Sequence, residues 1–171
     1  EDYRFETKVY ATGGIDKKGV LDGDLVIVGA HDITWSDTFY SSSRVPIDEI
    51  SSALYELGLR RVKGDVVATG EFMVGGDHYG SYDAEAQRRS ALSAIRKSLK
   101  SAGIKNDAGS SDSKGVAPKG ATLLTSYRSL PLSAACVPIN RISHNEFADA
   151  LLRHVAWVKS GKSSYEAGEK V

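Results

Sequence analysis

The feature that most restricts the fold is a short unit that occurs twice, Gly-Asp-Leu-Val at residues 23–26 and Gly-Asp-Val-Val at residues 64–67. Each copy places turn residues directly before an apolar, β-branched run, which is typical of the start of a strand. Two copies are too few for a solenoid, so we expect two paired strands in one small sheet. The alternative is two unrelated strands that use the same common turn chemistry.

A further strand and a helix accompany these units. Residues 4–12 alternate between two faces with the period of a half-buried strand, and we expect them to run antiparallel to residues 20–29. Residues 47–57 carry apolar side chains at helical spacing and stop at Gly58. Residues 1–80 are therefore predicted to form a small antiparallel β-sheet subdomain with one covering helix, in a protein of the α+β class.

The second half of the chain is predicted to be mainly helical. Residues 82–103 have an apolar stripe of helical period, and their arginines and lysines are most simply a solvated face. Residues 106–119 are rich in Gly, Ser and Asp, which indicates a mobile surface loop, and residues 121–126 follow as a strand. We expect residues 81–171 to be the helical portion of a second domain.

Charge and apolar content make two classes of partner unlikely on physical grounds. Lys and Arg together number 22, as do Asp and Glu, so the net charge of zero offers no basic surface for nucleic acid or an anionic membrane. No run approaches about 18 apolar residues, so no membrane-spanning helix is expected, and the first residues are not a signal peptide. The single cysteine, Cys136, excludes an internal disulfide.

The tripeptide Ser143-His144-Asn145 is the sequence feature to which a chemical role can be assigned. One interpretation is structural: Ser143 and Glu146 form a capping box that opens an amphipathic helix. The apolar side chains expected on the buried stripe of that helix are Phe147, Leu151, Val155 and Val158. The other interpretation is catalytic, since Ser-x-Asn places a hydroxyl and an amide beside the nucleophile of penicillin-interacting serine enzymes. The two interpretations do not exclude each other.

The residues around this tripeptide make the second interpretation more specific. They include Ser129, Pro131, Leu132, Ile139, Asn140, Arg141, Ala148, Leu151, Leu152 and Arg153. Together with Ser143 and Asn145 they closely resemble one stretch of the class C low-molecular-mass penicillin-binding proteins. These are the D-Ala-D-Ala carboxypeptidases and endopeptidases of bacterial cell-wall metabolism. Residues 3–7, 19–26 and 29–32 resemble the segment that follows the nucleophile helix in that family.

The resemblance implies a β-lactamase/transpeptidase-like domain for the helical portion, and acyl transfer from D-Ala-D-Ala peptides through a serine ester. Ser143 would shuttle a proton towards the leaving amine. Asn145 would hydrogen-bond the substrate backbone and help to position the lysine of the nucleophile helix. His144 stands where the family has an acidic or amide side chain, which leaves any role for it open.

The resemblance also implies partners and a location. The partners would be peptidoglycan stem peptides that end in D-Ala-D-Ala, and β-lactams in the intact enzyme. No cofactor is implied, and the location would be periplasmic or otherwise extracytoplasmic. A non-catalytic cell-envelope binding or scaffold module is the alternative function.

Two further matches to the motifs of this family are set aside on physical grounds. Residues 111–114 read Ser-x-x-Lys, but their Gly- and Ser-rich surroundings cannot hold the two side chains one helical turn apart. Residues 159–161, Lys-Ser-Gly, end a predicted helix, whereas the Lys-Thr-Gly motif of the family belongs on a strand. We therefore expect an interior portion of a longer enzyme, inactive by itself.

Two polar pairs invite comparison with a metal site, His31 with Asp32 and Asp77 with Tyr79. Neither pair supplies the three or four ligands that a metal site needs, so no metal site is predicted. The resemblance implies a structural role for Asp32.

Overall fold

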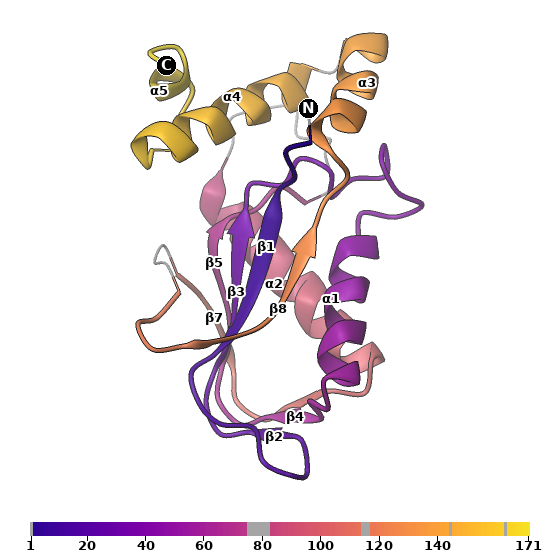
Figure 1. Ribbon diagram of the computed structural model, residues 1–171, viewed down its shortest axis with the longest axis vertical. Coiled ribbons are helices and arrows are strands. Elements are labelled where there is room, and N and C mark those ends of the chain that lie inside the picture. The colour runs from indigo at the N-terminus through magenta and orange to yellow at the C-terminus, as the bar shows by residue number, and fades with distance from the viewer. Residues whose placement is uncertain (1, 75–82, 114–116, 144, 163) are drawn as a thin grey trace.

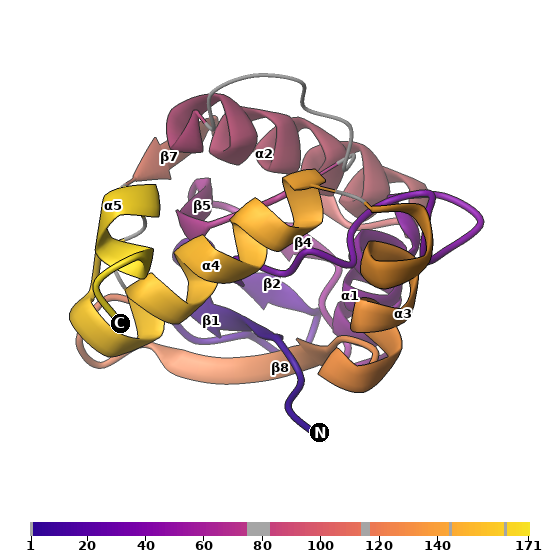
Figure 2. The same cartoon turned by 90° about the horizontal axis from the view of Figure 1, so that it is seen from above.

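The protein is built around a five-stranded sheet with helices against one face and at one end (Figures 1 and 2). The computed structural model describes residues 2–74, 83–113, 117–143, 145–162 and 164–171. The elements in chain order are β1 (Glu6–Ala11), β2 (Val20–Leu21), β3 (Leu25–Ala30), α1 (Val45–Glu56), β4 (Arg61–Val62), β5 (Val66–Glu71), α2 (Ala84–Ser101), β6 (Lys105–Asn106), β7 (Ser110–Ser113), β8 (Thr122–Arg128), α3 (Leu132–Ile142), α4 (Asn145–Ser160) and α5 (Tyr165–Gly168). Seen from above, α4 lies across the end of the sheet (Figure 2).

The main sheet is mixed, with the strand order β7-β5-β3-β1-β8. β1 pairs antiparallel with β3, where Val9 faces Ile27, so the predicted antiparallel pairing of these two strands is confirmed. β3, β5 and β7 are parallel to one another, because α1 and α2 each carry the chain back before the next strand begins. The α+β class is confirmed, but the prediction of an antiparallel sheet is corrected by these helical crossovers.

The two Gly-Asp units lie side by side, and the segment from β6 to β7 forms a third unit beside them. Leu25 of the first unit pairs with Val66 of the second, and Val66 pairs with Ser110, all in parallel register. The two-residue strands that precede them form a second parallel sheet, in the order β2-β4-β6. The expectation of paired strands is therefore confirmed. The third unit has no Gly-Asp-Val pattern and was not visible in the sequence.

Hydrogen bonds join the tight turns of the three units. The Asp24 carboxylate accepts from the amide of Asp65 at 2.8 Å. The amide of Gly64 donates to the Gly23 carbonyl at 3.0 Å. The Asn106 side-chain amide donates to the Gly64 carbonyl at 3.0 Å and ties the third turn to the second. Because a Cβ at Gly64 would lie 2.5 Å from the Gly23 carbonyl oxygen, only glycine fits between the stacked turns.

Two amphipathic helices fill the space against one face of the main sheet. The apolar side chains that they bury are Ile47, Ile50 and Leu54 from α1 and Leu92, Ile95 and Leu99 from α2. Burial of each such side chain contributes about 1.5–3 kcal/mol. The Asp83 carboxylate caps α2 by accepting from the amides of Glu85 and Ala86. Both helices predicted from the spacing of apolar residues are confirmed, with ends shifted by one or two residues.

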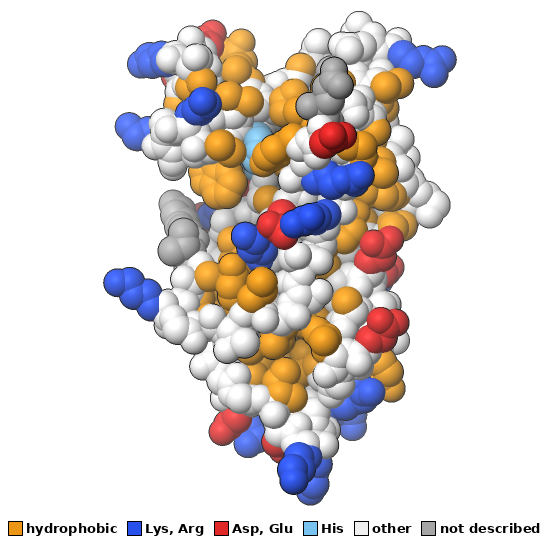
Figure 3. All heavy atoms as spheres, viewed as in Figure 1, with side chains coloured by type: hydrophobic (Ala, Val, Ile, Leu, Met, Phe, Trp, Pro, Cys, Tyr) orange, Lys and Arg blue, Asp and Glu red, His pale blue; other side chains and the backbone are white. Residues whose placement is uncertain are grey.

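Most apolar side chains on the opposite face of the sheet have intermediate or high exposure, although Val26 is buried there. Tyr10, Val28 and Val67 are half-buried there, and Leu123 is 51% exposed. On the face that Figure 3 shows, apolar side chains lie among polar and charged ones. The main core therefore lies on the side of α1 and α2.

Strands that follow residue 80 belong to the same sheet as those that precede it. β7 pairs with β5, β8 pairs with β1, and α2 packs against β5. The β-rich unit expected over residues 1–80 thus shares its sheet with part of the segment expected over residues 81–171. The loop predicted over residues 106–119 contains β7, because pairing with the backbone of β5 outweighs the low strand propensity of its serines. Residues 114–116 of that predicted loop lie outside the described residues.

A second apolar cluster joins the C-terminal helices to the end of the sheet. Its buried members are Phe5, Ile33, Met73, Ala135, Phe147 and Ala150. These residues come from the ends of strands and from α3 and α4, so the C-terminal helices pack on the sheet through a core of their own. In the described part of the chain, no helix is both long enough and apolar enough to cross a membrane.

We predict that Gly64→Ala destabilises the protein by about 1–3 kcal/mol, since the added methyl group must displace the stacked turns. Gly14→Ala is the matched control, because no atom lies within 4 Å of a Cβ built there and its φ is not positive. The free energy of unfolding from urea denaturation of both variants tests this. Equal stability of the two variants would show that the turns do not hold the units together.

Candidate functional site

The connection between α3 and α4 carries both candidate catalytic residues. α3 ends at Ile142 and α4 begins at Asn145, so Ser143 lies between two helices, and His144 lies outside the described residues. Ser143 and Asn145 are both exposed to solvent. Residues two apart within a helix would point about 200° away from each other. Ser143 is outside the helix, so that restriction does not separate the two side chains.

The backbone of Ser143 is left-handed, with a φ of 52°. This conformation is typical of a residue that ends a helix, whereas an N-cap residue has extended backbone. The residue directly before α4 is His144. The predicted capping box, with Ser143 as its cap, is therefore wrong. A left-handed conformation costs a serine about 1–2 kcal/mol.

Helix α4 is anchored by a buried face of which the sequence predicted Phe147 but not His154. Phe147 is fully buried and packs on Phe39, with ring centroids 5.2 Å apart. The His154 side chain is 4% exposed, and its Nε2 is 2.8 Å from the hydroxyl of Tyr3. Val155, predicted on the buried stripe, is instead 37% exposed. The buried face of α4 is therefore rotated towards His154, which fixes the helix on the N-terminal segment.

The start of α3 is clamped to the same N-terminal segment. The Ser129 hydroxyl accepts from the amide of Phe5 at 3.0 Å and donates to the Leu130 carbonyl at 2.6 Å. The amide of Leu132 donates to the Tyr3 carbonyl at 2.7 Å. Ser129 is 1% exposed, so its place in the sequence pattern reflects a structural role. Tyr3 and Phe5 thus hold both helices that flank Ser143.

Three titratable side chains are buried between the end of β3 and α4. Burial lowers the pKa of His31 to about 3, and nearby His154 and Arg153 lower it further in the same direction. Burial lowers the pKa of His154 to about 4. Burial raises the pKa of Asp32 to about 6, although its hydrogen bonds with Thr34 act against that shift. Both imidazoles are therefore neutral at pH 7, while Asp32 is largely ionised.

The geometry gives Asp32 a structural role, in agreement with the expectation. Its Oδ1 accepts from the amide of Thr34 at 2.8 Å and from the Thr34 hydroxyl at 2.7 Å, which shapes the turn after β3. His31, just before it, has a φ of 56° and is fully buried. Asp77 and Tyr79 lie outside the described residues. Across the residues that the structure does describe, no three His, Cys, Asp or Glu side chains are grouped to hold a metal ion.

The structure confirms that the two rejected motif matches have the wrong local geometry. Ser111 lies in strand β7 and not at the start of a helix, and Lys114 lies outside the described residues. Lys159 lies in the last turn of α4, and Gly161 follows with a φ of 72°, as a helix stop does. Of the motif matches in the sequence, Ser143 and Asn145 are the pair whose local backbone allows both side chains to point to the same side, where both are exposed to solvent.

Comparison with known proteins finds a matching family and solved structures with a similar fold. Residues 79–171 match the D-Ala-D-Ala carboxypeptidase 3 (S13) family. None of the curated proteins matches the chain. The fold is similar to that of penicillin binding protein 4 (dacB) from Haemophilus influenzae, with a TM-score of 0.75, 14% identity and coverage of 99% of this chain and 56% of that one. For the structure of the same protein complexed with a novel beta-lactam, the TM-score is 0.74 and the identity 16%, and the match covers 99% of this chain and 54% of that one. This chain therefore spans about half the length of those structures.

We predict that acid destabilises the protein through its buried histidines. In the unfolded chain a histidine binds its proton near pH 6.5, whereas the folded pKa values of His31 and His154 are about 3 and about 4. The unfolded state therefore binds more protons below pH 6.5, and stability falls as the pH drops towards 4. Asp32 acts in the opposite direction between about pH 6 and 3.8, but one carboxyl offsets only one of the two histidines.

The urea midpoints of the protein and of two variants at pH 7 and pH 5 test this assignment. His154→Gln should lose less stability than the native chain between these pH values, because one of the two histidines no longer titrates. Asp32→Asn should lose more, because the opposing carboxyl is gone. An identical loss in all three proteins would place the acid sensitivity elsewhere.

Proposed function

This chain belongs to the D-Ala-D-Ala carboxypeptidase 3 (S13) family, and on that premise we propose that it is part of a serine-type D-Ala-D-Ala carboxypeptidase or endopeptidase. The family match over residues 79–171 carries the proposal, because it includes the whole of the α3–α4 connection. The substrates would be peptidoglycan stem peptides that end in D-Ala-D-Ala. The reaction would be acyl transfer through a serine ester, followed by hydrolysis of that ester.

Ser143 and Asn145 are the residues of this chain to which we assign catalytic roles. When the nucleophilic serine attacks the penultimate D-Ala carbonyl, the C–N bond breaks and the leaving amine needs a proton. The Ser143 hydroxyl would relay that proton, and the Asn145 carboxamide would hydrogen-bond the substrate backbone and help to place the lysine beside the nucleophile. The exposure of both residues and the non-helical position of Ser143 support these roles.

The same premise assigns the elements of the fold to two parts of the enzyme. We propose that α3, α4 and α5 belong to the transpeptidase-like domain, and that the main sheet with α1 and α2 is a subdomain that supports it. The solved structure of penicillin binding protein 4 complexed with a novel beta-lactam favours β-lactams as inhibitors of the intact enzyme. Action on peptidoglycan would place the protein in the periplasm or elsewhere outside the cytoplasm.

We predict separable effects of two alanine variants, tested in the polypeptide that joins this chain to its Ser-x-x-Lys nucleophile. Ser143→Ala should lower the rate of D-Ala release by roughly 100-fold to 10,000-fold, the usual contribution of a positioned acid or base. Asn145→Ala should lower the rate of acylation while leaving the stability of α4 unchanged or slightly higher, since alanine has the higher helix propensity. Rates of D-Ala release and of penicillin acylation are the measurements.

A matched control separates catalysis from folding. Ser52 is also exposed and lies on α1, distant in the fold from the α3–α4 connection, so Ser52→Ala should keep native activity. Native turnover in Ser143→Ala and Asn145→Ala, measured on folded protein, would refute the catalytic assignment while leaving the family membership intact.

We further predict that the 171-residue polypeptide, by itself, is not labelled by a fluorescent penicillin. The Ser-x-x-Lys match begins at Ser111, which lies in a strand, whereas the motif needs its serine at the start of a helix so that the lysine amine can accept the hydroxyl proton. Mass spectrometry after incubation with the label would locate any adduct. Stoichiometric labelling of Ser111 would overturn the rejection of that match.

A further inference from the structure

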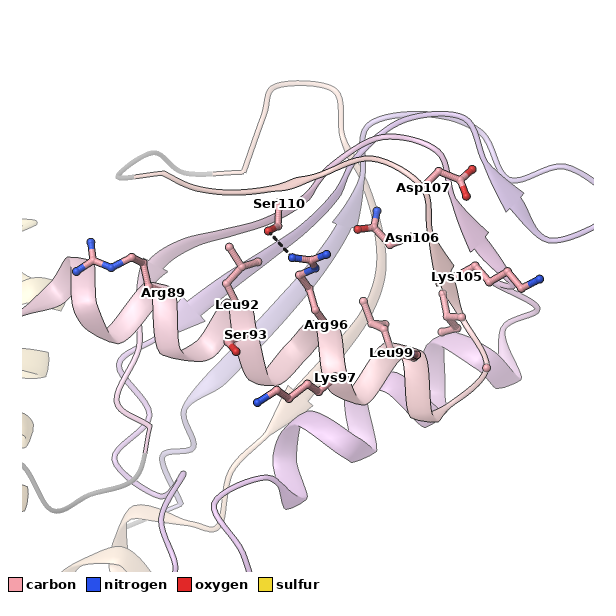
Figure 4. Close-up of a pocket in the computed structure, with 13 residues that line it drawn as sticks. Arg89, Leu92, Ser93, Arg96, Lys97, Leu99, Lys105, Asn106, Asp107 and Ser110 are labelled. Atoms are coloured by element: carbon pink, nitrogen blue, oxygen red, sulfur yellow. Dashed lines mark hydrogen bonds between the residues drawn. The ribbon is translucent and has the colours of Figure 1, made fainter.

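A groove of about 840 Å³ lies between α2 and the segment that forms β6 and β7 (Figure 4). Its lining includes the side chains of Leu92, Leu99 and Ile104, all of which belong to the main core. Arg96 reaches across from α2, and its guanidinium donates to the Ser110 hydroxyl at 3.2 Å (Figure 4). The groove therefore has an apolar floor and a polar bridge to the first residue of β7.

The rim of the groove concentrates positive charge in a chain whose net charge is zero. Its cations are Arg89, Arg96, Lys97, Lys100 and Lys105, all exposed. The one carboxylate in the lining, that of Asp107, is paired with Arg61 at 2.5 Å, and Arg89 is paired with Glu85. In the part of the chain that the structure describes, no ion pair joins the other four cations to a carboxylate. The rim thus favours an anionic ligand.

The groove runs beside two open sheet edges. β7 is the last strand of the main sheet and β6 is the last strand of the small sheet, within the described residues. In a parallel ladder every second amide and carbonyl faces away from the paired neighbour, so β7 presents main-chain donors and acceptors at its free edge. An extended peptide satisfies such an edge by adding a strand, with its side chains in adjoining pockets.

We propose that this groove and the edge of β7 bind an extended acidic peptide segment of a partner protein. Its main chain adds a strand beside β7, its acidic side chains meet the cationic rim, and its apolar side chains enter above Leu92 and Leu99. A second copy of this chain does not fit, because pairing the same edges would bring the two cationic rims together. A phosphate polymer would meet the charges but has no main chain to pair with the edge and nothing to cover the apolar floor.

A fluorescent peptide that alternates glutamate and valine over eight residues tests the proposal on the intact chain. We expect saturable binding by fluorescence anisotropy that weakens as salt is raised. Arg96→Glu/Lys100→Glu should weaken binding at least tenfold. Lys162→Glu/Lys170→Glu makes the same change in net charge at exposed positions near the C-terminus and should bind like the native chain. Equal affinity of the two double variants would overturn the proposal.

A second peptide tests the strand pairing separately from charge. Methylation of alternate backbone amides keeps the peptide sequence and charge but removes main-chain donors. The peptide whose methylated amides would face β7 should lose most of its binding. Native-like binding of both methylated peptides, one for each register, would overturn the strand-addition model. Tighter binding of inorganic polyphosphate than of the peptide, or dimerisation of the chain by sedimentation at the concentrations used, would also overturn it.

Discussion

The stacking of three tight turns is the interaction on which the rest of the structure depends. Asp24, Gly64 and Asn106 link these turns by hydrogen bonds, and the turns set the parallel register of both sheets. Parallel register in turn requires that α1 and α2 cross over the sheet, which places both helices over the main core. β1 and β8 complete the sheet at its other edge and bring the N-terminal segment to the base of α3.

The sequence predicts those parts of the fold in which local pattern and tertiary role agree. The alternation at residues 4–12 and the periods of α1 and α2 identify their elements, because each buries one face on the main core. The third unit could not be predicted, because β7 is an edge strand of polar residues whose pairing comes from the backbone of β5. The boundary near residue 80 was drawn where strand patterns give way to a mainly helical pattern, whereas the sheet is completed by β8, far along the chain.

The candidate site shows the same difference between local and long-range information. Ser143 and Asn145 were found from a motif and its flanks, which are local in sequence. His154 was missed because its partner is Tyr3, 151 residues away. It was also missed because histidine counts as a polar residue when a helix is searched for periodic apolar residues. Burial keeps both His31 and His154 neutral, and the uncharged His154 ring lies against the Phe5 ring, with centroids 4.6 Å apart.

The positions of Ser143 and Asn145 are therefore determined largely outside the α3–α4 connection. Exposed residues in a short connection have few contacts of their own, and the helices on either side must supply the order. α3 is fixed by the Ser129 hydroxyl and by the Leu132 amide, and α4 by Phe147 and His154. Three of these four contacts are made with Tyr3 or Phe5. A segment of three residues before β1 thus couples the sheet to the connection, so a change in that segment would move Asn145 without touching it.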